Sequence, residues 1–276
     1  MLPARWLVRV VVVVLTARDA AAGERAVAEI RAKHPQARVE TAALDLSSLA
    51  SVRAFATAWR ERGDGLDVLF HNAGVMQQSR TRRLTADGLE ETLGVNVLAP
   101  YLLTHELWPV LERSRARVVC VSSRMHLPDS RGAPVRFDFD DPLLEKNYQP
   151  ERAYKNSKLA MLWFTYELAR RAASHGVTVN AVCPGFVPVT AAESVKGPMR
   201  FFLRHVLVYA SFAQSVDGAT DAFVFMALDP SLDGVTGRFY GEQKPLASSP
   251  ESHDADKARR FWDYAARRTG VDPAWP

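Results

Sequence analysis

The chain is poor in cysteine and has no spacing of residues that would indicate a metal site. Its 276 residues include two cysteines, Cys120 and Cys183, which lie far apart in apolar segments. We therefore expect both thiols to be reduced core residues, and we expect no metal site. No repeat, low-complexity stretch or linker rich in proline, glycine or serine divides the chain. The sequence thus predicts a single domain over residues 1–276.

Long runs of charge and of apolar residues are also absent. The formal charge of +4 comes from scattered arginines, with no basic cluster interleaved with aromatic residues, so we expect no nucleic-acid partner. The uninterrupted apolar run from Val10 to Leu15 leads straight into Arg18 and Asp19. It predicts a buried β-strand in preference to a signal peptide. We expect a cytoplasmic protein without stable membrane insertion.

The dominant pattern is an alternation of short valine-rich runs with longer amphipathic segments between residues 10 and 183. This alternation is typical of an α/β fold with a doubly wound parallel sheet, Rossmann-like, with helices on both faces. The predicted strands are Val10–Thr16, Arg38–Ala43, Asp67–Asn72, Arg117–Ser122, Thr178–Cys183 and Gly237–Tyr240. The predicted helices are Ala21–Lys33, Leu49–Arg62, Leu89–Arg113, Glu151–Ser174, Val216–Leu228 and 251–268, the last with Phe261, Trp262 and Ala265 facing inward.

Tyr154 and Lys158 carry the strongest chemical signal in the chain. They are four residues apart, so one helical turn places the phenol and the ammonium on the same face. A nearby cation would lower the pKa of the phenol from about 10 towards neutrality. Ser123, at the end of a predicted strand, could hold a carbonyl or alcohol oxygen beside the phenol. Taken alone, the pair could equally be a half-buried aromatic residue with a solvated lysine.

The ordered motifs of the chain resemble the short-chain dehydrogenase/reductase family, and within it the retinol-dehydrogenase-like branch, over about residues 10 to 245. The matching stretches are Leu15–Asp19, Asp45–Leu46, Asn72–Gly74, Asn96, Val121–Ser123, Tyr154 with Lys158, and Val179–Gly185. This resemblance implies a single doubly wound domain that binds a nicotinamide dinucleotide. It also implies a homo-oligomer formed through the helix that carries Tyr154 and its neighbour.

The resemblance implies a role for each of four catalytic residues. Tyr154 would be the acid/base, Lys158 would lower its pKa and hold the nicotinamide ribose, and Ser123 would orient the reacting oxygen. Asn96 would support a water-linked proton relay to Lys158, although a helix asparagine bonded to neighbouring backbone is the alternative. Ser122 is the rival of Ser123; only one of two adjacent strand residues faces the site, and the family pattern selects the second.

The resemblance also assigns a cofactor site at the carboxyl ends of the strands. Asp45 would contact the adenine, and Gly74 would let the backbone approach the adenosine ribose closely. Arg18 favours the 2′-phosphate of NADP, and NAD is the less favoured cofactor. The full set of expected cofactor contacts is Arg18, Asp45, Asn72, Ala73, Gly74, Tyr154, Lys158, Pro184, Gly185, Val187 and Thr190.

One expected part of a dinucleotide fold does not fit into this sequence. A glycine-rich phosphate turn should come about 20 residues before the ribose-recognising residue. Seventeen residues precede Arg18, and the first glycine of the chain is Gly23. We therefore expect an N-terminally incomplete fold without its central strand, which would leave two strand edges unpaired.

Three functional hypotheses follow from these observations. The favoured one is an NADP(H)-dependent oxidoreductase that interconverts an alcohol and a carbonyl on an apolar small-molecule substrate. The alternative is a truncated, catalytically inactive relative that acts as a binding or interaction protein. The apolar stretch Met199–Tyr209 suggests a third, a peripheral membrane binder, but a substrate lid over residues 190–213 is the preferred role for that region.

Overall fold

The computed structural model describes residues 11–188 and 213–276. The strands are β1 (Val12–Ala17), β2 (Arg38–Ala43), β3 (Val68–His71), β4 (Arg117–Val121), β5 (Thr178–Cys183), β6 (Phe239–Gly241) and β7 (Lys244–Pro245). The long helices are α1 (Ala20–Lys33), α2 (Leu49–Arg62), α4 (Ala99–Ser114), α5 (Pro150–Arg171), α8 (Val216–Leu228) and α9 (Ala255–Thr269). β2, β5, α2 and α8 have the predicted bounds, whereas β7 was not predicted. The predicted lid and Met199–Tyr209 lie almost wholly outside the described residues.

The strands are parallel, as predicted, except for the terminal pair β6 and β7. They form two sheets: β1 pairs only with β2, and the other sheet has the order β3-β4-β5-β6-β7. Val12 and Val13 are 54% and 45% exposed. The expectation of a buried first strand is therefore wrong for this half of β1, because only one of its edges is paired.

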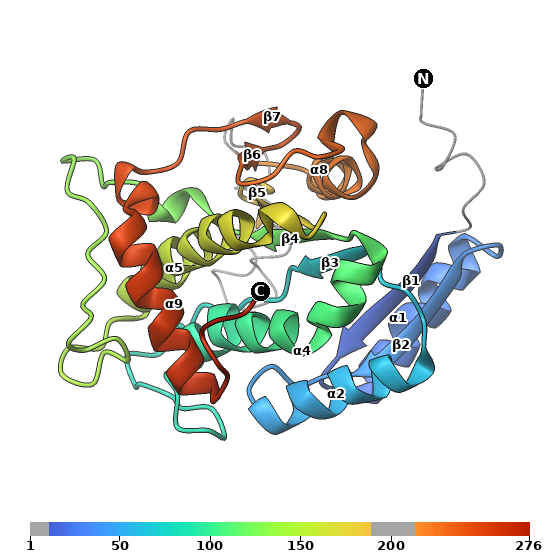
Figure 1. Ribbon diagram of the computed structural model, residues 1–276, viewed down its shortest axis with the longest axis horizontal. Helices are drawn as coiled ribbons and strands as arrows, with labels where there is room; N and C mark the ends of the chain where they lie inside the picture. The colour runs from blue at the N-terminus through green and yellow to red at the C-terminus, as the bar shows by residue number, and fades with distance from the viewer. Residues whose placement is uncertain (1–10, 189–212) are drawn as a thin grey trace.

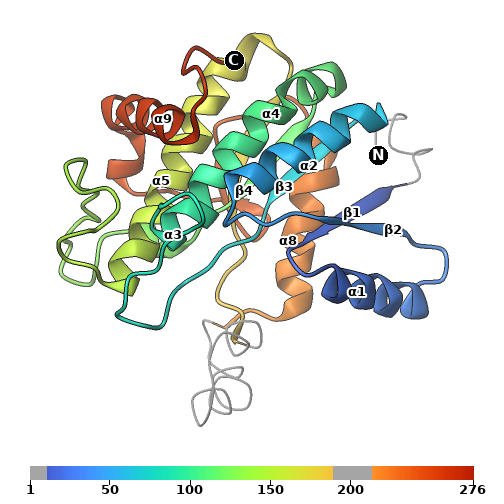
Figure 2. The same ribbon diagram turned by 90° about the horizontal axis from the view of Figure 1, so that it is seen from below.

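Helices cover both faces of the strands and enclose two separate apolar cores. Figure 2 shows α2, α4, α5 and α9 on one side, with α1 and α8 on the other. The larger core contains alternate residues of β4 and β5, such as Cys120 and Ala181, packed against α4, α5 and α9. The smaller core joins the opposite faces of the same strands, through Val119 and Val182, to Met226 of α8. The sequences of β4 and β5 are therefore nearly continuous apolar runs, because both faces of these strands are buried.

The predicted helix over residues 89–113 is interrupted near its start. A short α3 (Glu91–Leu93) leads into a π-helical segment, Gly94–Leu98, before α4 begins. The amide of Ala99 donates to the carbonyl of Gly94, five residues back. Pro100 has no amide hydrogen to continue the ordinary four-residue pattern, so the wider turn is accommodated here. The bulge contains Asn96.

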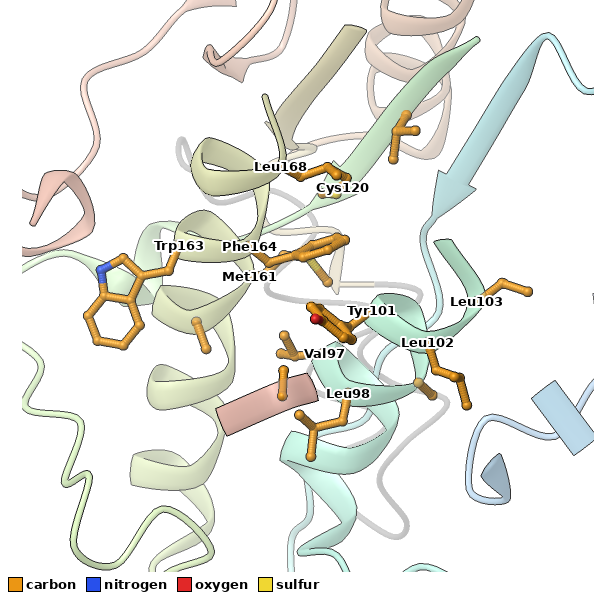
Figure 3. Close-up of a cluster of buried hydrophobic side chains, with 14 of the residues drawn as sticks. Val97, Leu98, Tyr101, Leu102, Leu103, Cys120, Met161, Trp163, Phe164 and Leu168 are labelled. Carbon is orange, nitrogen blue, oxygen red and sulfur yellow. The ribbon is translucent and has the colours of Figure 1, made fainter. Parts of the chain in front are cut away.

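The C-terminal helix α9 crosses α5 and α4 on the larger core (Figure 1). Its predicted inward residues, Phe261, Trp262 and Ala265, are all buried, which confirms their orientation. The helix starts later than predicted because Pro250–His253 forms a 3-10 turn and Asp254 then caps α9. Figure 3 shows Tyr101, Met161 and Phe164 of the same core between α4 and α5. The α4 and α5 face is therefore covered by α9.

We predict that Trp262→Ala lowers the free energy of unfolding by about 3 to 5 kcal/mol. The indole stacks on Phe164 and meets Tyr101 edge-on, so its removal opens a cavity in the larger core. Urea denaturation measures the change. Val216→Ala, at a position that is 52% exposed, is the control and should change stability by less than about 0.5 kcal/mol. Equal losses in the two variants would contradict the assigned packing.

Candidate active site

The parallel strands end at a common edge, and α5 brings its side chains to that edge. Arg18 follows β1, Asn72 follows β3, Ser122 and Ser123 follow β4, and Pro184 follows β5. In open sheets of parallel strands, ligands bind beyond the carboxyl ends. The structure thus gathers most of the residues singled out from the sequence on one side of the molecule.

The Ser123 hydroxyl lies beside the Tyr154 phenol, close enough to lower the pKa of the phenol. Ser123 is held in place as the cap of a 3-10 turn, Arg124–His126, where its hydroxyl accepts the amide of Met125 at 3.2 Å. Ser122 points elsewhere: its buried hydroxyl donates to the Lys158 carbonyl at 2.9 Å. The two adjacent serines therefore have different contacts, and only Ser123 reaches the phenol.

Lys158 lies beneath the phenol and is tied to β4. Its ammonium donates to the Val121 carbonyl at 2.9 Å and lies 5.4 Å from the centroid of the Tyr154 ring. Burial lowers the pKa of Lys158 to about 8. The same burial raises the pKa of Tyr154, and the nearby Ser123 hydroxyl only partly opposes it. The expected lowering of the Tyr154 pKa by Lys158 is therefore not seen in this structure, because desolvation dominates.

Asn96 fastens the turn after β3 to α5. Its amide oxygen accepts the Val75 amide at 2.7 Å, and its nitrogen donates to the Val75 carbonyl and the Ser157 hydroxyl, both at 3.0 Å. Ser157 in turn donates to the Tyr154 carbonyl at 2.8 Å. These contacts correspond to the structural alternative for Asn96. Its part in a proton relay stays a prediction.

Gly74 brings the turn after β3 close to Lys158. A Cβ at this position would lie 3.4 Å from the Asn96 amide oxygen and 3.6 Å from the Lys158 nitrogen. An added methyl group would therefore make van der Waals contact with both polar atoms and lie over the ammonium. Asn72, Ala73 and Gly74 are all exposed, which leaves their backbone open to a ligand.

The other expected cofactor residues lie in separate surroundings. Asp45 is partly engaged already, since its carboxylate accepts the amide and hydroxyl of Ser47 at 2.9 and 2.7 Å. Arg18 is exposed just after β1. Pro184, Gly185 and Val187 form the loop after β5, and Gly185 has a left-handed φ of 84°. Thr190 lies outside the described residues.

A hydrogen-bonded histidine, His126, was missed by the sequence analysis. It is fully buried, its Nδ1 bonds to the Ser123 carbonyl, and its Nε2 accepts the Ser249 amide at 3.2 Å. Burial lowers the pKa of His126, which keeps the ring neutral and able to accept. The histidine thus connects the serine turn to the segment before α9. The one sequence feature that could have pointed to His126 was its position three residues after Ser123.

Comparisons with known proteins show which family the chain belongs to. A family described as short chain dehydrogenase matches residues 8–134, and one described as enoyl-(acyl carrier protein) reductase matches residues 143–239. Retinol dehydrogenase 14 of Mus musculus is 34% identical over 94% of this chain and 78% of its own length. The chain belongs to the short-chain dehydrogenase/reductase family. A probable oxidoreductase of Streptomyces lividans is 38% identical over 83% of this chain and 80% of its own length.

Solved structures of this family share the fold. An uncharacterized protein from Mycobacterium paratuberculosis is 30% identical, with a TM-score of 0.64, covering 94% of this chain and 84% of its own. The NADPH-bound carbonyl reductase from chicken fatty liver is 22% identical, with a TM-score of 0.60, covering 86% of this chain and 88% of its own. These matches confirm the α/β fold with a parallel sheet.

The described residues of this short-chain dehydrogenase/reductase fit the ribose of a dinucleotide better than its pyrophosphate. The exposed β3 turn, with Gly74 against Lys158, suits a ribose that approaches closely. For the pyrophosphate, residues 11–188 and 213–276 include no glycine-rich turn before a helix. Gly23 lies inside α1 and is a packing residue, because a Cβ there would lie 2.3 Å from the Thr41 hydroxyl.

We predict that Lys158→Met stabilises the protein most at neutral pH. Folded Lys158 loses its proton near pH 8, whereas an unfolded lysine keeps it to about pH 10.5. Between these values the unfolded state holds more protons, so the contribution of Lys158 to the free energy of unfolding rises with pH. The advantage of the Met variant should shrink by about 2 to 3 kcal/mol between pH 7.5 and pH 10 in urea titrations. A difference that does not vary with pH would contradict the buried, depressed pKa.

Proposed function

We propose that the protein is an NADP(H)-dependent oxidoreductase that interconverts an alcohol and a carbonyl on a lipophilic small molecule. The observation that carries the proposal is that the Ser123 hydroxyl lies beside the Tyr154 phenol, with the Lys158 ammonium beneath the ring. Two hydroxyls that meet at the carboxyl edge of the sheet can share one substrate oxygen. Family membership supports this reaction class.

In the reducing direction, Ser123 and Tyr154 donate hydrogen bonds to the carbonyl oxygen of the substrate. A bound nicotinamide supplies hydride for reduction and accepts it for oxidation. As the oxygen gains negative charge, Tyr154 transfers its proton to it, which gives the alcohol. The raised pKa of Tyr154 keeps the phenol protonated at neutral pH and ready to donate. The charge of Lys158 then stabilises the phenolate that remains.

The proposed choice of NADP rests on Arg18. The side chain is exposed immediately after β1, at the strand end where an acidic residue would select the free ribose hydroxyl of NAD. A guanidinium there can bind the 2′-phosphate of NADP. Asn72 and Gly74 would hold the adenosine ribose, and Lys158 the nicotinamide ribose. Pro184, Gly185 and Val187 would meet the carboxamide.

A lipophilic substrate is supported by apolar side chains on two loops near the site. Met76 follows the β3 turn and is 37% exposed, and Phe186 follows β5 and is 38% exposed. Retinol, which the mouse relative is named for, is an alcohol of this kind. The described residues hold no cluster of three metal-ligating side chains. The proposed reaction uses the hydroxyls of Ser123 and Tyr154, the ammonium of Lys158 and the dinucleotide.

A binding or interaction protein without activity is the second candidate function. The observation that favours it is that residues 11–188 and 213–276 provide no phosphate turn. The cytoplasmic location and the homo-oligomer stay proposals; any contact between copies would use a face other than the one α9 covers. In the part of the chain that the structure describes, no helix is long and apolar enough to span a bilayer.

We expect Tyr154→Phe to lower kcat for carbonyl reduction by about 100-fold or more, because it removes the proton donor. Ser123→Ala should lower kcat by a similar factor through the lost hydrogen bond to the oxygen. Ser231→Ala is the control, since it removes an exposed hydroxyl that donates to the Asp229 carboxylate, away from the carboxyl ends of the strands. NADPH oxidation with a panel of aldehydes provides the readout. Near-full activity of Tyr154→Phe would rule out the mechanism.

Cofactor binding separates the two candidate functions. A ligand that binds only the folded state stabilises it by about 2.7 kcal/mol at a hundredfold excess over its dissociation constant. We expect NADPH to raise the melting temperature more than NADH does, and Arg18→Ala to remove that difference. Arg25→Ala, an exposed arginine on α1, is the control. If neither nucleotide shifts the melting temperature, the inactive binding protein becomes the favoured function.

A further inference from the structure

A cavity of about 1370 Å³ separates β1 from β3. Its walls include Val12 and Val14 of β1, Val68 and Phe70 of β3, and Phe223 of α8. The two sheets diverge at this place, as Figure 2 shows. The cavity thus lies within the plane of the strands, between two edges that face each other.

Both edges present backbone groups to the cavity. On β1, the carbonyls of Leu15 and Ala17 accept hydrogen bonds from the β2 side, at 3.1 and 3.0 Å. In a parallel strand, neighbouring residues direct their amide and carbonyl groups to opposite edges, so Val14 and Thr16 point theirs at the cavity. On β3, the Asp67 carbonyl is bonded to the Arg117 amide of β4 at 2.9 Å, so Phe70 points its groups at the cavity.

The size and lining of the cavity match a β-strand. A strand of six residues is about 20 Å long. Neighbouring strands are about 4.8 Å apart and packed layers about 10 Å apart, so such a strand occupies about 950 Å³. The lining is apolar on both faces of the sheet: Val14 and Leu69 pack towards the larger core, Val68 and Phe70 towards the smaller one. A strand at this position would be buried on both faces and would therefore be apolar throughout.

One face of the cavity is also uncovered, between α1 and α8. Val224 of α8 is 51% exposed, and Val12 and Val13 of β1 are 54% and 45% exposed. Exposed apolar side chains gathered beside unpaired strand edges indicate an occupant that buries both. A helix that follows the inserted strand would cover Val13 and Val224, whereas Val12 lies on the opposite face with Val14 and would pack beside the inserted strand itself.

We propose that this cavity, the strand slot, binds an extended apolar polypeptide strand that runs parallel to β1 and β3 and carries an amphipathic helix onto the face between α1 and α8. The inserted strand would donate and accept hydrogen bonds on both of its edges. It would join the two sheets into one. Lipids and small apolar molecules could fill the slot but could not bond to both edges.

The probe is a fluorescein-labelled synthetic peptide with a strand of six valine, isoleucine and threonine residues, a glycine-containing turn and an amphipathic helix. Fluorescence anisotropy measures its binding to the full chain in the absence of nucleotide, so the result does not depend on the proposed reaction. We expect saturable binding with one peptide per chain. Amide exchange should slow at least about tenfold at Val14, Thr16 and Phe70, and much less at Leu15, which is already bonded to β2.

Two peptides with N-methyl groups on alternate strand residues test the two edges separately. One set loses the donors that face β1, and the other loses those that face β3. We expect each to lower affinity at least about tenfold, because hydrogen bonds on a buried edge are removed. If only one of the two N-methylated peptides loses affinity, the peptide pairs with a single strand edge, and the proposed strand slot is wrong.

Chain variants provide the complementary test. Val13→Asp places a carboxylate beside the slot at an exposed position and should lower peptide affinity at least about tenfold. Val216→Asp, equally exposed but at the start of α8 and away from the slot, should bind normally. Equal effects, absence of peptide binding, or a dimer by light scattering with the same amides protected without peptide would each contradict the proposal.

Discussion

The reciprocal bonding between Lys158 and the end of β4 is the constraint on which the site depends. The lysine ammonium donates to the carbonyl of Val121, and the next residue, Ser122, returns a hydrogen bond to the lysine carbonyl. These two bonds fix the register of α5 against β4. Ser123, one residue further, is thereby placed against Tyr154, one turn earlier on the same helix. The relative position of Ser123 and Tyr154 therefore follows from a strand-to-helix junction held by two hydrogen bonds.

The junction also buries the Lys158 ammonium, which is unfavourable for its charged form. Burial lowers the pKa of Lys158 and raises that of Tyr154, so the proton affinities of the two groups move apart. Such mutual displacement is common at functional sites, where stability is exchanged for reactivity. A site of this kind favours proton transfer only when a substrate oxygen completes the hydrogen-bond network.

Much of the fold could be predicted from the sequence because its signals are local. Valine-rich runs predicted the strands, and α2 begins where predicted, after its cap Ser48. The interruption before α4 was missed because Pro100 is an acceptable early helix residue, so its effect on the preceding turn was not recognised. His126 was missed for a similar reason: its partner Ser249 is 123 residues away.

The electrostatics of the candidate site were harder to predict than its residues. Spacing alone placed Tyr154 and Lys158 on one face and suggested a lowered phenol pKa. The opposite shift arises from desolvation, which depends on how completely β4, β5 and α5 bury the pair. Similarly, the valines of β1 looked like an interior strand, and only the pairing of its edges shows which of them meet solvent.

The position of α9 affects how the stability of the protein depends on its concentration. The broad apolar face formed by α4 and α5 is closed by a segment of the same chain, in which Trp262 and Trp275 both meet Tyr101 edge-on. Folding of this half of the protein is thus a unimolecular event. The contribution of this closure to stability does not depend on protein concentration, and α5 stays covered when the protein is scarce.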